Sequence, residues 1–221
     1  MLKLNIQLFG GRGASSSSGV GGGGKPNEAT EYYVSGEGQW INQYLRGRGD
    51  FGELSANEKQ YLKDLDKATN GKIKDSELYR SVDASAIFGN MSQMDYENLH
   101  QYLVNGSSSF GKGNYADGIR NNMNNIINNA KGKNITEKGF MSTTSDKSVA
   151  ENWGDFTGSE KPVVMKIKTS KNTKGVNLSN YDKNVSKDEA QKERLLARNQ
   201  TYKVDNVTSR NGKIYVDVSM K

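Results

Sequence analysis

The hexapeptide Gln191-Lys192-Glu193-Arg194-Leu195-Leu196 decides how the rest of the chain is interpreted. Its second half has the composition of a short buried strand, and Glu193 stands at the mouth of that strand. The polar segment 177–190, which has no apolar periodicity, comes directly before it. Because a buried charge is costly, a glutamate at this position is expected to have a chemical role.

Two earlier segments are candidates to meet Glu193. In segment 77–83, Arg80 shares one face of a strand pattern with Leu78 and Val82. Two interpretations of Arg80 are open: a clamp for a phosphate, which suits the guanidinium geometry, or an arginine that forms a salt bridge or faces water at a sheet edge. The second segment, Gly139-Phe140-Met141-Ser142-Thr143-Thr144-Ser145, places a run of hydroxyl groups on a strand.

Composition limits the chemistry. The chain has 221 residues, which is enough for one domain of ordinary size and a tail. It contains no cysteine and a single histidine, so disulfides, cysteine-based metal sites and histidine clusters for zinc are excluded. His100, within a helical pattern, is interpreted as a surface residue or a residue with a hydrogen-bond partner, and not as a catalyst. The formal net charge of +6 comes from scattered charges, which favours a solvated basic surface over a nucleic-acid interface.

The first 30 residues differ from the rest. Residues 1–9 alternate apolar and polar side chains like a half-buried strand, and a Gly/Ser tract extends to Gly24. We therefore expect a tail and flexible tether over 1–30 and an ordered domain over 31–221. The opening resembles the start of tailed-phage head-associated proteins, which implies phage head components as partners of residues 1–9; a disordered tail is the alternative.

Localisation is predicted from the same features. No apolar run approaches the roughly 20 residues that a membrane span needs, and residues 1–9 are too short for the apolar core of a signal peptide. The sequence therefore predicts a protein that is virion-associated or in the host cytoplasm, with no membrane and no nucleic acid among its partners.

Periodicity predicts an α+β fold, with helices concentrated in the first part of the chain and strands in the last. A capping box at Ser55 and Glu58 marks one helix start, and Asn211-Gly212 marks a β-hairpin. The helices are expected at 40–45, 56–68, 94–103, 119–130 and 147–153. The strands are expected at 77–83, from after Gly132 through Phe140 to Thr144, and at 163–167, 194–197, 202–207 and 214–220.

The arginine, hydroxyl and glutamate segments, in this order, resemble the motifs of mono-ADP-ribosyltransferases. The form here is similar to the arginine, Ser-Thr-Ser and Gln-x-Glu motifs of Rho-inactivating clostridial exoenzymes. An Ile-Asn-x-x-Leu-Arg segment, residues 41–46, also fits, and the resemblance spans roughly 41–218. It implies N-terminal helices packed on a split pair of mostly antiparallel β-sheets with an NAD cleft between them. The implied enzyme cleaves the nicotinamide–ribose bond of NAD and transfers ADP-ribose to a protein.

The resemblance also implies roles for individual residues. Glu193 is the catalytic acid that stabilises positive charge on the ribose, and Ser142 fixes its carboxylate. The residue two before the glutamate, Gln191, selects the acceptor and favours an amide side chain, with arginine as the other option. The cofactor-binding residues are Arg80, Ser142, Thr143, Thr144 and Trp153, with NAD as co-substrate and no metal.

Several alternatives stay open. The hydroxyl motif reads Ser142-Thr143-Thr144 and departs from Ser-Thr-Ser at the third position, and Glu189 allows a shifted register of the glutamate motif. Trp153 is either a core residue or an aromatic that stacks on nicotinamide. NAD glycohydrolase activity is a side reaction of the expected enzyme. The alternative function is a non-enzymatic phage head-associated binding module with a degenerate fold of the same kind.

Overall fold

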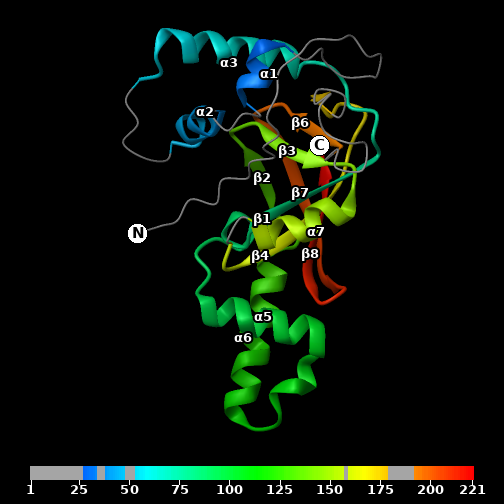
Figure 1. Cartoon of the computed structure of the whole chain (residues 1–221). Coiled ribbons are helices and arrows are strands. Elements are labelled where there is room, and N and C mark those ends of the chain that lie inside the picture. Colours follow the sequence, from blue (N-terminus) through cyan, green and yellow to red (C-terminus); the bar gives the residue numbers. More distant parts are fainter. Residues whose placement is uncertain (1–26, 34–37, 48–52, 157–158, 179–191) are drawn as a thin grey trace.

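The computed structural model describes residues 27–33, 38–47, 53–156, 159–178 and 192–221 and shows helices at both ends of a large sheet (Figure 1). The helices are α1 (Glu28–Tyr32), α2 (Gly38–Leu45), α3 (Ala56–Ala68), α4 (Ser85–Phe88), α5 (Gln93–Asn105), the 3-10 helix η2 (Ser107–Phe110), α6 (Asn114–Ala130) and α7 (Lys147–Phe156). The strands are β1 (Glu77–Asp83), β2 (Asn134–Glu137), β3 (Met141–Thr144), β4 (Pro162–Lys168), β5 (Gly175–Asn177), β6 (Glu193–Leu196), β7 (Gln200–Arg210) and β8 (Lys213–Met220).

The strands of the described residues form one eight-stranded sheet in the order β2-β7-β8-β4-β1-β3-β6-β5. These neighbours are antiparallel except β4 and β8, which are parallel. Between β1 and β3, both fully described, the only residue pair in register is Tyr79 with Thr144. We call this junction the seam, and the five strands and three strands on either side of it the half-sheets. The expected α+β fold is confirmed, and the two sheets expected to be separate are hydrogen-bonded into one across the seam.

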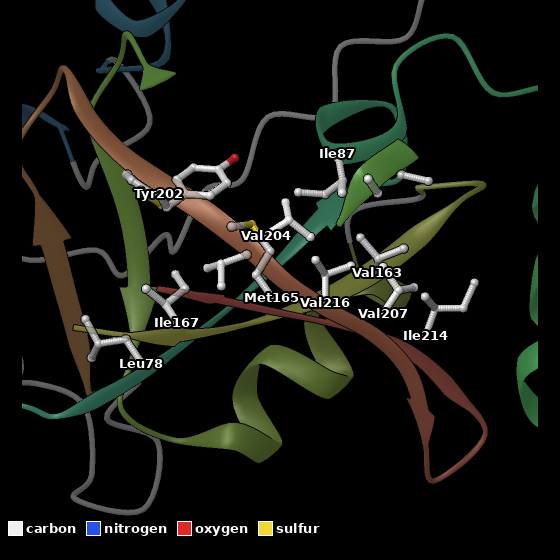
Figure 2. Close-up of a cluster of buried hydrophobic side chains, with 14 of the residues drawn as sticks. Leu78, Ile87, Val163, Met165, Ile167, Tyr202, Val204, Val207, Ile214 and Val216 are labelled. Carbon is white, nitrogen blue, oxygen red and sulfur yellow. The ribbon is translucent and has the colours of Figure 1, made fainter. Parts of the chain in front are cut away.

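Two apolar cores pack on the sheet, and the larger one extends across the seam, since it includes Met141 of β3 and Leu196 of β6. The five-stranded half buries side chains of β1, β4, β7 and β8 together with α4, α5 and α6; Leu78, Met165 and Val216 are among those labelled in Figure 2. The three-stranded half packs Leu195 and Val176 against α1, α2 and α3. Because apolar burial is the main driving force of folding, these two clusters fix which helices cover which half-sheet.

Helix α7 covers a smaller cluster next to the seam. Ala150 of α7 packs there with Val164 of β4 and Tyr215 of β8, and Tyr79 of β1 lies partly buried against them. Tyr79 therefore faces α7, while Leu78 on the same strand faces the larger core. This alternation agrees with the strand faces predicted from the sequence.

Local signals in the sequence are confirmed where the structure describes them. Ser55 caps α3, because Glu58 N donates to Ser55 Oγ at 3.2 Å and Ser55 N donates to Glu58 Oε2 at 2.7 Å. Asn211 and Gly212 adopt φ of 51° and 72°, as a tight β7–β8 hairpin requires. His100 lies half-buried on α5, and its Nε2 is 2.7 Å from Gly212 O, so it is a histidine with a hydrogen-bond partner, as the second interpretation from the sequence has it.

Some expectations lie outside the described residues. The strand-like residues 1–9 and the tether belong to the undescribed segment 1–26, so the division into 1–30 and 31–221 stays a prediction; α1 begins at Glu28. Across the described part of the chain, no helix has the length and apolar character needed to cross a membrane. The single strand expected after Gly132 through Thr144 is two strands, β2 and β3. The short strand β5 was not predicted, since three residues carry too little periodicity.

Candidate active site

Glu193 is the first residue of β6 and pairs across the strands with Thr144 of β3. Its exposed fraction is 8%, which is unusual for a glutamate. Burial raises the pKa of Glu193 to about 8, and a hydrogen bond from the Ser142 side chain partly offsets this by stabilising the carboxylate. The structure therefore brings together two of the residues that were predicted to be catalytic.

The hydroxyl strand β3 is buried along its whole length. Ser142 shares the face of Glu193, because directly opposed residues of an antiparallel pair point to the same side. The Thr143 hydroxyl donates to Arg194 O at 2.8 Å, and the Thr144 hydroxyl accepts from Asp146 N at 2.9 Å. The two threonines, predicted to bind cofactor, thus make hydrogen bonds within the protein that hold β3 against β6 and the start of α7.

Arg80 lies on β1, on the other side of the seam. Two of its guanidinium nitrogens, Nε and Nη1, are buried and have no hydrogen-bond partner among the described residues. Burial lowers the pKa of Arg80, and the nearby charge of Arg46 lowers it further, while Glu137 acts in the opposite direction. An arginine with buried, unused donors is ready for an anionic ligand, because leaving such donors unpaired is costly.

Arg46 supplies a second guanidinium at the same place. It follows the last turn of α2, and its Nε donates to Glu137 Oε1 at 2.9 Å, while Gly139 N donates to the same oxygen at 2.8 Å. Burial opposes ionisation of Glu137, but the charge and hydrogen bond of Arg46, helped by Arg80, hold its pKa below the usual range. Two arginines around one carboxylate leave a net positive site, which suits a diphosphate.

Tyr33 connects the two sides of the site, and sequence reasoning missed it. This buried tyrosine has a raised pKa, chiefly because of burial; its side chain is hydrogen-bonded to Ser142, and it is close enough to Arg80 and Glu193 to sense both charges. Asn42 Nδ2 donates to the Tyr33 hydroxyl at 2.7 Å. The signal that could have found it is Asn42, which belongs to the 41–46 motif and needs a polar partner once it is buried.

For the other residues predicted to belong to the site, the structure gives less information. Trp153 lies on α7 with a half-buried side chain and a buried Nε1. Gln191 and Glu189 lie outside the described residues, so their roles stay predictions. No group of three or more acidic or histidine side chains that could hold a metal ion occurs in the described segments.

At Gly139 the surrounding atoms leave no room for a side chain. A Cβ at this position would lie 2.6 Å from Asn42 Oδ1 and 3.2 Å from Arg46 Nε. Asn42 cannot give way easily, because its Oδ1 accepts from Phe140 N at 2.7 Å and its Nδ2 donates to Phe140 O at 3.1 Å. We expect Gly139→Ala to lower the free energy of unfolding, measured by chemical denaturation, by about 1–3 kcal/mol.

The matched control for this prediction is Gly118→Ala in α6. Its Cβ would meet nothing within 4 Å, so this helical substitution should raise the free energy of unfolding by about 0.5–1 kcal/mol. A Gly139→Ala protein as stable as the control would show that Asn42 and Arg46 are not held where we describe them.

Solved structures show the same fold. C3larvin toxin from Paenibacillus larvae superimposes with a TM-score of 0.56 and 22% identity over 88% of this chain and 86% of that chain. C3stau2 from S. aureus, solved with NAD, gives a TM-score of 0.57 and 22% identity over 86% and 84%. The C3 exoenzyme of Clostridium limosum gives 0.54 and 21% identity over 87% and 83%. No curated protein matches the chain significantly.

A family model described as ADP-ribosyltransferase exoenzyme matches residues 25–221, which is nearly the whole chain. The match includes the arginine of β1, the hydroxyl strand β3 and the glutamate that opens β6. Proteins of this family use NAD as co-substrate. This chain belongs to the ADP-ribosyltransferase exoenzyme family.

Proposed function

We propose that this protein is an NAD-dependent mono-ADP-ribosyltransferase that breaks the nicotinamide–ribose bond and passes ADP-ribose to a protein side chain. One observation carries the proposal: a buried carboxyl, Glu193, is hydrogen-bonded to Ser142 in the same polar cluster as Arg80, whose guanidinium has unused donors. Strongly perturbed titrating groups gathered in one place are typical of active sites.

The described residues fit the diphosphate of NAD. Arg80 has buried Nε and Nη1 donors with no described partner, and Arg46 adds a second positive charge beside it. Charge-assisted hydrogen bonds from guanidinium groups to phosphate oxygens are strong and directional. Glu137 keeps the two arginines together in the absence of ligand, since it holds Arg46 directly and attracts Arg80.

Glu193 supplies the charge that the bond cleavage needs. Loss of nicotinamide builds positive charge on the ribose, and a nearby carboxylate stabilises that charge, as in sugar hydrolysis. Ser142 fixes the carboxylate by a hydrogen bond, and Tyr33 in turn fixes Ser142. The surrounding apolar core limits access of bulk water and so strengthens the electrostatic effect.

The acceptor side chain is assigned by the resemblance alone. Gln191, two residues before Glu193, favours an amide side chain on a protein substrate, with arginine as the other option. Where water takes the place of the protein acceptor, the same bond cleavage gives free ADP-ribose, which is the glycohydrolase side activity.

The test is incubation of the purified protein with a cell lysate and NAD labelled in the adenosine part. We expect label to become covalently attached to a lysate protein, nicotinamide to be released, and mass spectrometry to locate the ADP-ribose on one side chain. Absence of both label transfer and nicotinamide release would contradict the proposal, whereas release alone would identify a glycohydrolase.

Association with a virion is a separate proposal and rests on residues 1–24 of the sequence. A non-enzymatic head-associated module would keep the fold but would not bind NAD. Thermal unfolding with millimolar NAD separates the two functions, because a ligand of the folded state raises the melting temperature. Detection of the protein in purified virions tests the association itself.

A further inference from the structure

The two groups that must act on one dinucleotide lie on different half-sheets. Arg80 belongs to β1, whereas Ser142 and Glu193 belong to β3 and β6. The seam between these described strands holds one residue pair in register, Tyr79 with Thr144. Because the strand pairing at this junction is so short, other contacts across it help to set the separation of Arg80 from Glu193. One of them is the packing of Met141 and Leu196 in the larger core with Leu78 of β1.

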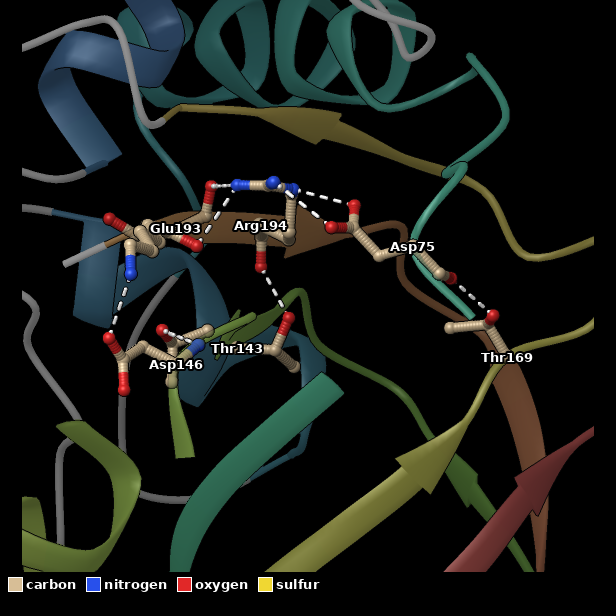
Figure 3. Close-up of polar contacts among 8 residues, drawn as sticks. Asp75, Thr143, Asp146, Thr169, Glu193 and Arg194 are labelled. Carbon is tan, nitrogen blue, oxygen red and sulfur yellow. Dashed lines mark hydrogen bonds and ion pairs between the residues drawn. The ribbon is translucent and has the colours of Figure 1, made fainter. Parts of the chain in front are cut away.

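A bidentate ion pair crosses the seam. Arg194 of β6 donates to Asp75 from Nε to Oδ2 at 2.8 Å and from Nη2 to Oδ1 at 3.0 Å (Figure 3). Asp75 lies two residues before β1 and is itself attached to the end of β4, because the Thr169 hydroxyl donates to Asp75 O. The pair therefore connects β6 to the start of the strand that carries Arg80, with β3 between them.

The Arg194–Asp75 pair is better shielded than an ordinary surface ion pair. The side-chain exposed fractions are 11% for Arg194 and 25% for Asp75. Bidentate geometry and partial burial both raise the strength of an ion pair above that of an exposed one. Such a contact can hold two structural units in one relative position.

The guanidinium of Arg194 also fixes the backbone at Glu193 and at Lys192, the residue before it. Arg194 Nη1 donates to Lys192 O at 3.0 Å and to Glu193 O at 3.2 Å. Lys192 has a φ of 46°, a left-handed conformation that is unfavourable for a residue with a side chain. Its carbonyl accepts a second hydrogen bond from Ser145 N at 3.2 Å, and its Nζ lies 2.9 Å from Asp146 Oδ2. This backbone conformation is thus held by Arg194 of β6 and by the two residues that follow β3.

We propose that Asp75 and Arg194 form a positioning pair that holds the two half-sheets at the separation at which Arg80 and Glu193 act on the same dinucleotide. The proposal rests on the proposed function. Neither residue is a catalytic residue, because Arg194 points to the face of β6 opposite Glu193 and acts on it through the backbone. Loss of the pair should impair the chemical step and leave the binding of the diphosphate by Arg80 intact.

Asp75→Asn is the sharpest variant, since it keeps the shape of the side chain and removes its charge. We expect it to lower kcat for nicotinamide release about 10-fold or more, because small displacements of catalytic groups cost large factors in rate. The KM for NAD and the Kd for ADP, a probe that contains the diphosphate without the nicotinamide end, should stay close to the wild-type values. Arg194→Gln should lower kcat at least as much, because it also removes the hydrogen bonds to Lys192 O and Glu193 O, and the double variant should be no worse than Arg194→Gln alone.

Asp66→Asn is the matched control. Asp66 of α3 makes the same bidentate contact with Arg198, at 2.7 Å and 2.8 Å, just beyond the other end of β6. Because this pair does not cross the seam, its loss should leave kcat unchanged. It should lower the melting temperature, although less than Asp75→Asn does, since Arg198 and Asp66 are more exposed, at 30% and 38%. Equal loss of kcat in both variants would show that the Arg194–Asp75 pair acts only through stability.

A second measurement does not depend on activity. In protein labelled with 13C-glutamate, the Glu193 carboxyl signal is identified by its absence in Glu193→Gln, and its titration is followed by NMR. Displacement of Glu193 from Ser142 in Asp75→Asn should raise its pKa by about one pH unit, since a hydrogen bond to the charged form is lost. If the wild-type protein releases no nicotinamide, the proposed function fails. In that case an unchanged pKa of Glu193 in Asp75→Asn overturns the positioning role as well. If the wild-type protein is active, an unchanged kcat in Asp75→Asn overturns the positioning role.

Discussion

The Glu193→Gln variant is expected to release nicotinamide from NAD about 10²–10³ times more slowly than the wild-type protein, because it loses the charge that stabilises the ribose cation. The substitution preserves shape, and the amide oxygen can still accept the hydrogen bond that Ser142 makes to residue 193. The affinity for NAD should therefore change little, since Arg80 and Arg46 are untouched. Stopped assays of nicotinamide release and calorimetric NAD binding measure the two effects separately.

The same variant should be more stable than the wild-type protein, and the gain should depend on pH. In the folded protein the pKa of Glu193 is raised to about 8 by burial, against an ordinary value of 4.5. The folded state therefore binds more protons than the unfolded state between these values, and wild-type stability falls as the pH rises through this window. Because each pH unit between the two pKa values corresponds to about 1.4 kcal/mol, the full penalty above pH 8 is on the order of 5 kcal/mol. We expect a melting temperature higher by about 10–20 °C at alkaline pH and nearly equal in mild acid.

Glu151→Gln is a matched control, because its effect on stability at alkaline pH should have the opposite sign to that of Glu193→Gln. Burial opposes ionisation of Glu151 in α7, but the Tyr215 hydroxyl and Lys147 outweigh it and lower its pKa. Glu151 therefore contributes stability above its unfolded pKa, and its amide variant should be less stable at alkaline pH, with nicotinamide release intact. Two results would remove the basis for assigning Glu193 as the buried catalytic acid. One is full activity of Glu193→Gln, and the other is a Glu193→Gln protein that is less stable than the wild-type protein at alkaline pH.

Arg80→Met is expected to raise the KM for NAD about 100-fold, because the diphosphate loses charge-assisted hydrogen bonds in a partly buried site. Without ligand, the variant should be at least as stable as the wild-type protein. The guanidinium of Arg80 has two buried nitrogens with no partner among the described residues, and the neighbouring Arg46 repels it. Replacing an unpaired buried charge by an apolar side chain of similar length is stabilising. Melting temperatures with and without NAD, together with steady-state kinetics, measure both effects.

Arg80→Lys separates charge from geometry. Lysine keeps the positive charge but cannot form two parallel hydrogen bonds to a phosphate, so its KM for NAD should fall between wild type and Arg80→Met. Binding of nicotinamide alone, which has no phosphate, should be the same in all three proteins. If Arg80→Met bound NAD as tightly as the wild-type protein, the diphosphate would have to lie elsewhere.

Local patterns were enough to predict most of the elements around the site. The capping box at Ser55 and the Asn211-Gly212 turn act within four residues, so sequence alone specifies them. The glutamate at the mouth of β6 was also visible, because a charge next to Leu195 and Leu196 conflicts with burial. For Arg80 the sequence left a phosphate clamp and a salt bridge open; its unused buried donors favour the clamp.

The other parts of the site depend on contacts between distant segments. Tyr33 reaches Ser142 from a remote part of the chain, and nothing near Tyr33 in the sequence marks it as part of a site. Arg46 and Glu137 also form an ion pair between distant segments of the chain, and so do Asp75 and Arg194. Charged residues are common on any surface, so a pair of them becomes informative only when the fold brings the two side chains together.

The burial of Glu193 has a consequence for which dinucleotide the protein can use. A carboxyl with a pKa of about 8 carries its proton at neutral pH when no ligand is bound. Under the proposed function, a pyridinium ring beside Glu193 would bring a positive charge that favours the ionised carboxylate. Reduced nicotinamide has no such charge and leaves the acid neutral. We therefore expect binding of the oxidised dinucleotide to release a proton from Glu193 and binding of the reduced one to release none.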